Sequence, residues 1–160
     1  MLDRVSIRLA TMDDCIALAR LAEQLGYPAS PDSLASRLDR AIANADHHVA
    51  VAQSDGEVVG WIHIIRDTSL LHDGHAEIAG LIVDPGSRNR GIGRRLMESA
   101  EHWAGAHACE VITVRSNTIR TDAHRFYESL GYSSTKTQHV FRKKLPAAGV
   151  HSIATSPDRI

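Results

Sequence analysis

Residues that could bind a phosphate group gather between Arg88 and Arg95, where four arginines and two glycines fall within eight residues. Gly91 and Gly93 permit backbone conformations that other residues resist, and they leave main-chain N–H groups open to a ligand. The apolar pattern that follows predicts a helix over residues 91–106, so these groups stand at a helix N-terminus. Unsatisfied N–H groups and the helix dipole favour an anion there. The segment therefore predicts a pyrophosphate site; a plain strand-to-helix connection with solubilising arginines is the alternative.

The spacing in this turn differs from two familiar phosphate-binding motifs. Arg94 and Arg95 break the glycine pattern of a dinucleotide-binding fingerprint, and no Gly-Lys-Ser or Gly-Lys-Thr follows, as a P-loop requires. What remains, from Arg88 to Gly93, is Arg-Asn-Arg-Gly-Ile-Gly. An apolar strand predicted for residues 77–83 precedes it. The turn therefore needs another interpretation.

This turn resembles the pyrophosphate-binding motif Arg/Gln-x-x-Gly-x-Gly/Ala of the GCN5-related N-acetyltransferase (GNAT) superfamily. The segment from Ala123 to Tyr132, Ala-His-Arg-Phe-Tyr-Glu-Ser-Leu-Gly-Tyr, is similar to a second motif of that family, Ala-x-x-Phe-Tyr-x-x-x-Gly-Phe/Tyr. The resemblance covers roughly residues 5–145, because the order of elements also fits the fold of that family. It implies transfer of an acetyl group from acetyl-CoA to a primary amine, by direct attack in a ternary complex and without a metal ion.

By this resemblance, the end of the strand and the turn hold acetyl-CoA. A β-bulge near the strand end splays it from its neighbour, and exposed backbone groups pair with the pantetheine arm as an added strand would. Core packing of the same side chains is compatible with that role, because side chain and main chain act separately. The residues implied in binding acetyl-CoA are Leu81, Ile82, Val83, Arg88, Asn89, Arg90, Gly91, Ile92, Gly93, Arg94 and Asn117.

Two side chains are implied in catalysis. An attacking amine must be neutral, and an alkylamine with a pKa of about 10 is helped by a base. Glu77 stands where several family members carry a general-base glutamate; a solvent-facing strand residue is the alternative. Tyr127 matches the family tyrosine beside the CoA sulfur, where a hydroxyl can protonate or stabilise the leaving thiolate. For Tyr127 the alternative is aromatic packing.

Asn117 departs from the family pattern. The family often places an asparagine seven residues before the tyrosine, but Arg120 occupies that position here and Asn117 lies ten before Tyr127. A loop enlarged by three residues would still deliver Asn117 to the pantetheine. For Arg120 three roles stay open: contact with the CoA phosphates, contact with the acceptor, or plain solvation.

The other predicted elements build a sheet with helices on both faces. We predict strands over 5–9, 48–52, 58–65, 111–114, 132–136 and 140–145, and helices over 12–25, 31–42 and 121–130. Together with the strand and helix named above, this order predicts an α/β (α+β) fold of the GNAT type. We expect a mixed, mostly antiparallel central sheet of about seven strands flanked by about four helices, and the GNAT resemblance implies that this sheet is splayed at a bulge.

Composition predicts one soluble domain. The chain has 160 residues, of which 43% are hydrophobic and 23% charged. We expect a single domain over 1–146 and a flexible C-terminal tail over 147–160. The formal net charge of −1 favours neither nucleic acid nor a membrane surface, and the ten histidines lack metal-ligand spacing. Two unpaired cysteines and the lack of an apolar leader predict a cytoplasmic protein.

The acceptor stays open between a small-molecule amine and a peptide amine. Residues 126–132 and 137–145 faintly resemble aminoglycoside 6'-N-acetyltransferases, whose polycationic acceptors call for an acidic pocket. The rival from another class is a noncatalytic acyl-CoA-binding sensor or assembly module, which would need neither Glu77 nor Tyr127. The resemblance also allows a homodimer through the C-terminal strands.

Overall fold

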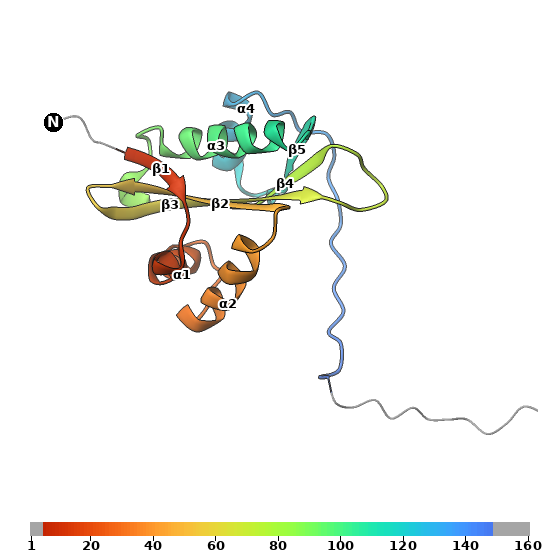
Figure 1. Cartoon of the computed structure of the whole chain (residues 1–160). Coiled ribbons are helices and arrows are strands. Elements are labelled where there is room, and N and C mark those ends of the chain that lie inside the picture. The colour runs from red at the N-terminus through yellow and green to blue at the C-terminus, as the bar shows by residue number, and fades with distance from the viewer. Residues whose placement is uncertain (1–4, 149–160) are drawn as a thin grey trace, which may run out of the picture.

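An open sheet of five strands lies between two layers of helices in the computed structural model of the chain, which describes residues 5–148 (Figure 1). The strands lie in sequence order across the sheet. The elements are β1 (Val5–Leu9), η1 (Met12–Asp14), α1 (Cys15–Gln24), α2 (Pro31–Ile42), β2 (His47–Ser54), β3 (Glu57–Asp67), β4 (His75–Val83), η2 (Pro85–Ser87), α3 (Ile92–Ala106), β5 (Val111–Val114) and α4 (Thr121–Ser129).

Strands β1 to β4 pair as antiparallel neighbours, and β5 pairs with β4 in parallel. The hairpin between β2 and β3 turns at Asp55 and Gly56, whose φ values of 50° and 86° suit a tight primed turn. The predicted mixed, mostly antiparallel sheet is therefore confirmed.

Local signals begin both helices of the first layer. The Ser30 hydroxyl accepts a hydrogen bond from the Ser33 N–H at 3.1 Å, and Pro31 occupies the first turn of α2. Before α1, Thr11 and Asp14 form a capping box. Ile16 in the first turn of α1 is exposed, whereas Leu18 and Leu21 of the same helix are buried.

The sheet separates two apolar cores. Above it in Figure 1 lies α3, whose buried residues pack on the centre of the sheet: Ile92, Leu96, Met97, Ala100 and Ala104. Below it lie α1 and α2, which contribute Leu18, Leu21, Leu38 and Ala41 to the second core. Burial of this apolar area on both faces is the main stabilising term of the fold, and β4 contributes to both cores through Ile78 and Ile82.

A β-bulge interrupts β4 at Ala79. Ile78 pairs with Ile64 of β3 and Gly80 pairs with His63, which leaves Ala79 as an extra residue. Pairing of β4 with β5 ends at the same place, at Ile78. Within the described residues no strand pairs with β4 on that side from Ala79 to Val83, so the sheet opens there as the family resemblance predicts.

The predicted count of about seven strands is not confirmed. Residues 132–136 and 140–145 form no strand in the structure, where the chain beyond α4 runs away from the sheet (Figure 1). Val140, Phe141 and Leu145 are exposed along it. Alternating apolar residues become a strand only when a neighbour accepts their backbone hydrogen bonds, and this segment lies away from the sheet.

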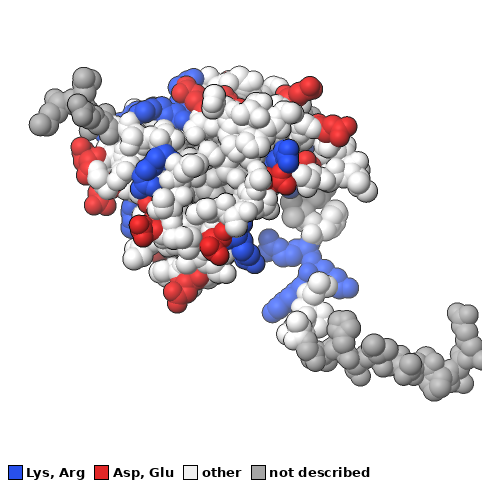
Figure 2. All heavy atoms as spheres, viewed as in Figure 1, with Lys and Arg blue, Asp and Glu red and all other residues white. Residues whose placement is uncertain are grey.

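Residues 149–160, which make up most of the predicted tail, lie outside the described residues. Among residues 5–148, no helix has the length and apolar character needed to cross a bilayer. Acidic and basic side chains are interspersed on the face that Figure 2 shows, in keeping with the near-zero net charge.

Candidate active site

The turn before α3 presents an uncapped helix end. Gly91 occupies the N-cap position in the left-handed region, with φ at 75°, and no side chain among the described residues caps the helix. The preceding Asn89 also has a positive φ, of 61°. Because the first-turn N–H groups of an α-helix have no intrahelical acceptor, those of Ile92, Gly93 and Arg94 are available to an anion.

The strand end beside this turn is held by Asp84. Its Oδ1 accepts a hydrogen bond from the Gly86 N–H at 3.0 Å, and its Oδ2 accepts one from Arg20 Nη1 at 3.0 Å. The Arg20 guanidinium holds the pKa of Asp84 below its usual range. The Asp84 N–H in turn donates to the Val59 carbonyl at 2.8 Å. This anchoring places the turn at a defined position on the sheet.

The arginines of the turn are exposed but oriented by the chain. Arg88 Nε donates to the Val83 carbonyl at 3.1 Å, and Arg94 Nη2 reaches the Ser129 carbonyl at 3.5 Å. Arg90 Nη2 contacts the Ser54 hydroxyl at 3.4 Å. Three cations therefore belong to the turn and the first helical residues, where their positive charge favours a doubly charged diphosphate.

Gly91 and Gly93 are glycines for different reasons. The positive φ of Gly91 disfavours any side chain, although a Cβ there would meet nothing within 4 Å. A Cβ on Gly93 would lie 3.1 Å from Cζ of Phe126, which packs α4 against α3. Gly93 thus serves the packing of the protein itself, whereas the sequence had suggested open access for a ligand.

The backbone of β4 beyond the bulge faces the opening in the sheet. The Asp84 N–H donates to Val59, so the backbone groups of Asp84 point toward β3. In an antiparallel ladder the backbone groups of successive residues point to alternate sides. The N–H and C=O groups of Leu81 and Val83 therefore point away from β3, toward the opening. The side chain of Ile82 is buried in the core below the sheet. The main-chain groups of Ile82 face β3, where Ile82 pairs with Trp61, and the buried Ile92 can contribute only main-chain groups.

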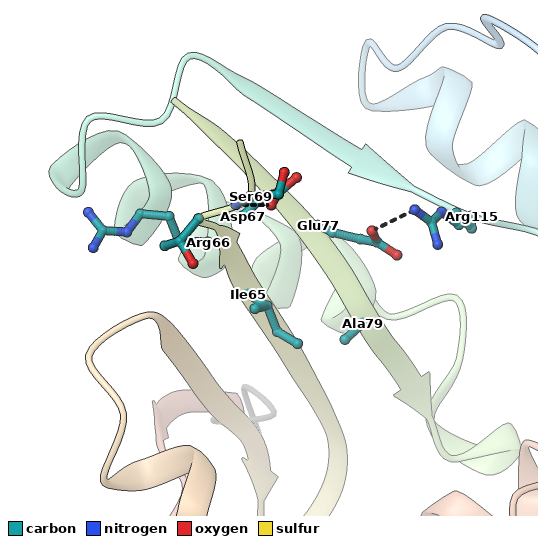
Figure 3. A pocket seen from close by; sticks show the side chains of 8 residues that line it. Ile65, Arg66, Asp67, Ser69, Glu77, Ala79 and Arg115 are labelled. Carbon is teal, nitrogen blue, oxygen red and sulfur yellow. Dashed lines mark hydrogen bonds and ion pairs between the residues drawn. The ribbon is translucent and has the colours of Figure 1, made fainter. Parts of the chain in front are cut away.

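Glu77 lines a pocket of about 480 Å³ on the face of the sheet away from α3. Its Oε2 lies 3.2 Å from Arg115 Nη2, and Figure 3 shows the two side chains pointing toward one another. Ile65 and Ala79 form an apolar part of the same lining. The carboxylate is thus in a pocket, as a general base requires, but it is paired with a cation.

Tyr127 lies on α4 and packs edge-on against two other rings. Its ring centroid is 5.3 Å from that of Phe126 and 6.1 Å from that of Tyr132. Burial raises the pKa of the Tyr127 hydroxyl above its usual value, and the nearby charge of Arg120 opposes that shift. The hydroxyl therefore keeps its proton at neutral pH and can donate a hydrogen bond.

Asn117 lies in the loop between β5 and α4 and is used locally. Its Oδ1 accepts a hydrogen bond from the Ile119 N–H at 3.2 Å, and its carbonyl accepts one from His124 Nε2 at 3.0 Å. Arg120 stands at the N-cap of α4, close enough to Tyr127 to influence its pKa. The structure therefore places Arg120, rather than Asn117, in electrostatic contact with the candidate acid.

Two residues of this region escaped the sequence analysis. Arg115 follows β5 and reaches Glu77 only because β5 pairs with β4. Ser116 follows it, and its hydroxyl is buried with no hydrogen-bond partner in the described part of the chain. A buried polar group without a partner is costly, so the Ser116 hydroxyl suits a ligand in the opening between β4 and β5. Neither residue belongs to a recognisable motif.

Comparisons with known proteins agree on one family. The family model described as the acetyltransferase (GNAT) family matches residues 12–132. An aminoalkylphosphonate N-acetyltransferase of Salmonella typhimurium is 33% identical over 135 residues, covering 81% of this chain and 85% of the relative. An aminoglycoside N(6')-acetyltransferase type 1 of the same species is 25% identical over 133 residues, covering 78% of this chain and 88% of the relative.

Among solved structures, the aminoglycoside N-acetyltransferase AAC(6')-Iy in complex with CoA matches with a TM-score of 0.80. The match covers 91% of this chain and 98% of that chain, at 18% sequence identity. At that identity the likeness shows that the two proteins share a fold.

Proposed function

This chain belongs to the acetyltransferase (GNAT) family, and on that premise we propose that it transfers the acetyl group of acetyl-CoA to a primary amine of a small molecule. The observation that carries the proposal is the uncapped N-terminus of α3 beside the unpaired edge of β4. The N-terminus of α3 would hold the diphosphate of acetyl-CoA, and the edge of β4 would hold the pantetheine arm attached to that diphosphate. Few other ligands combine these two parts.

The residues present fit acetyl-CoA. The first-turn N–H groups of α3, with Arg88, Arg90 and Arg94 around them, suit the pyrophosphate. The backbone of Leu81 and Val83 suits the amides of the pantetheine arm, which would add to the sheet as a strand does. The Ser116 hydroxyl, which follows β5 and has no partner among the described residues, is a further candidate donor, while Asn117 would have to leave its local turn to contribute.

Acetyl-CoA supplies an activated acyl thioester when bound, and the chain supplies the proton transfers. We assign Glu77 to accept the proton that the amine loses, directly or through one water molecule. Tyr127 donates a hydrogen bond to the departing sulfur. Because its pKa is raised, full transfer of its proton to a thiolate is disfavoured, so we assign Tyr127 to stabilise the thiolate by hydrogen bonding.

The acceptor classes named for the relatives differ in charge. An aminoalkylphosphonate carries an anionic group beside its amine, whereas an aminoglycoside carries several amines. Both are small amines, and we propose an acceptor of that size for this chain because the pocket beside Glu77 has a volume of about 480 Å³.

Calorimetric titration with acetyl-CoA tests the binding half of the proposal, and thiol release in the presence of amines tests the transfer half. A ligand at about 100 times its Kd raises the free energy of unfolding by about 2.7 kcal/mol, so a thermal shift should accompany binding. Binding without thiol release from any amine would favour a noncatalytic acyl-CoA-binding module instead.

A matched pair of variants at Gly91 tests the assigned turn. Gly91→Asp places a carboxylate at the uncapped helix end, where it should repel the diphosphate and weaken acetyl-CoA binding at least about tenfold. Gly91→Asn has nearly the same shape, tolerates a positive φ and is neutral, so it should retain most of the affinity. Equal affinities of the two variants would place the diphosphate elsewhere.

A further inference from the structure

We propose that the acceptor is a small amine that also carries an anionic group, and that Arg115 binds that anion. This inference rests on the proposed acetyl transfer and names the substrate class of the same site. It starts from the ion pair between Arg115 and Glu77, both of which line the pocket.

Arg115 is the cation that a ligand in this pocket can reach. Its side chain is 76% exposed, and that of Glu77 is 33% exposed. The other arginine of the lining, Arg66, is committed to Asp46: Arg66 Nε donates to Asp46 Oδ1 at 2.7 Å. In Figure 3 the Arg66 side chain points away from Glu77, whereas Arg115 points toward it.

The two carboxylates of the pocket lining, Asp67 and Glu77, also differ in their partners. Asp67 Oδ1 accepts a hydrogen bond from the Ser69 N–H at 2.8 Å, and this bond holds the pKa of Asp67 below its usual range. Glu77 has Arg115 as its ionic partner. Asp67 therefore stays ionised on the lining, while Glu77 and Arg115 stand side by side as an adjacent negative and positive group, which matches a ligand with one ammonium and one anion.

Such a ligand can exchange partners with the existing ion pair. An ion pair with an exposed arginine contributes little to stability, so its separation costs little. A phosphonate, phosphate or carboxylate offers the guanidinium fork two oxygens, a better match than the single contact with Glu77. Once released, the Glu77 carboxylate faces the ammonium of the same ligand and is free to accept its proton.

Amines without an anionic group cannot replace the ion pair between Arg115 and Glu77 in this way. A neutral-tailed amine must separate Glu77 from Arg115 and leaves the guanidinium without an anion. A polyamine brings a second cation toward Arg115, and like charges repel. Ile65 and Ala79 line the pocket beside the pair and suit a short alkyl spacer between amine and anion.

The test compares acceptors of similar length in the thiol-release assay with acetyl-CoA. The probes are 2-aminoethylphosphonate, O-phosphoethanolamine and 3-aminopropanoate as anionic amines, propylamine as the neutral-tailed amine, and 1,3-diaminopropane as the dication. The wild-type enzyme should prefer at least one anionic amine over propylamine by about tenfold or more in kcat/KM. The three anionic probes show which anion Arg115 prefers.

Variants then assign the preference to Arg115. Arg115→Gln should remove the preference, so that the ratio of kcat/KM for the anionic amine to kcat/KM for propylamine falls close to one. Arg115→Lys should retain part of the preference, since it keeps the charge but loses the fork. Arg40→Gln, an exposed arginine of α2 outside the pocket, is the control and should match the wild type.

Titration of 2-aminoethylphosphonate into the enzyme with CoA measures Arg115 without requiring turnover, and Arg115→Gln should weaken this binding at least about tenfold. The inference is overturned if wild type and Arg115→Gln share the same acceptor preference, or if the variant loses activity equally with every amine. Absence of thiol release with all probes, combined with Arg115-dependent binding, would instead overturn the proposed transfer and leave the anion site standing.

Discussion

Replacing Tyr127 by phenylalanine removes one hydroxyl from the candidate active site while keeping the ring. The ring contacts with Phe126 and Tyr132 stay, at centroid distances of 5.3 and 6.1 Å, so the fold should lose little stability. The wild-type hydroxyl is protonated at neutral pH because burial raises its pKa. Its proposed role is a hydrogen bond to a developing thiolate.

The size of the effect follows from that role. A hydrogen bond to a charged group contributes about 1.5–3 kcal/mol, and each 1.36 kcal/mol changes a rate about tenfold. Since the thiolate charge exists only as the sulfur departs, the loss should fall on kcat rather than on acetyl-CoA affinity. We therefore expect Tyr127→Phe to lower kcat roughly ten- to a hundredfold with a Kd for acetyl-CoA close to that of the wild type.

Tyr132→Phe is the matched control. It removes a hydroxyl from the same aromatic cluster, but that hydroxyl donates to Glu101 Oε1 on α3 at 2.9 Å and has no role in the proposed transfer. Thiol release gives kcat, and calorimetry gives Kd. An unchanged kcat in Tyr127→Phe, or an equal fall in Tyr132→Phe, would refute the assigned role.

Further predictions concern stability. Gly60→Ala should lower the free energy of unfolding by about 1–3 kcal/mol, because the new Cβ would lie 2.8 Å from the Ile82 carbonyl oxygen. Gly105→Ala in α3 places its Cβ in open space and should raise the free energy of unfolding by about 0.5–1 kcal/mol. Urea denaturation of both variants checks this contrast, and equal effects would contradict it. Burial, with the charges of neighbouring histidines, lowers the pKa of His63 from 6.5 to about 4. The unfolded chain therefore binds a proton that the folded chain does not, and the free energy of unfolding should fall by up to roughly 3 kcal/mol as the pH drops from about 6.5 to about 4. His63→Gln should flatten this slope in denaturation series at several pH values, and a slope that persists would assign it to other groups.

Features decided by neighbouring residues were predictable from the sequence. The start of α2 at Ser30 and Pro31, the Asp55-Gly56 hairpin and the glycine turn before α3 all depend on residues a few positions apart. Capping, turn formation and an open helix end are local effects, so the residue order contains them.

Features decided by distant partners were not predictable in the same way. The segment after α4 alternates as a strand does, but it lies away from any sheet edge that would complete its hydrogen bonds. Arg115 and Glu77 are far apart in sequence, and only the parallel pairing of β5 with β4 joins them. The family motif located the carboxylate but contained no signal for the cation that opposes it.

The extra residue at Ala79 divides β4 into two halves whose side-chain phases are independent. Before it, Ala76 and Ile78 face the α3 layer; after it, Ile82 faces the opposite layer, although all three have even numbers. An insertion or deletion at this position would rotate one half by a full side-chain step while the other half kept its orientation. The side chains on the Glu77 half of β4 can thus change the face they occupy without altering the backbone edge from Ala79 to Val83, so the two halves of this strand can vary independently.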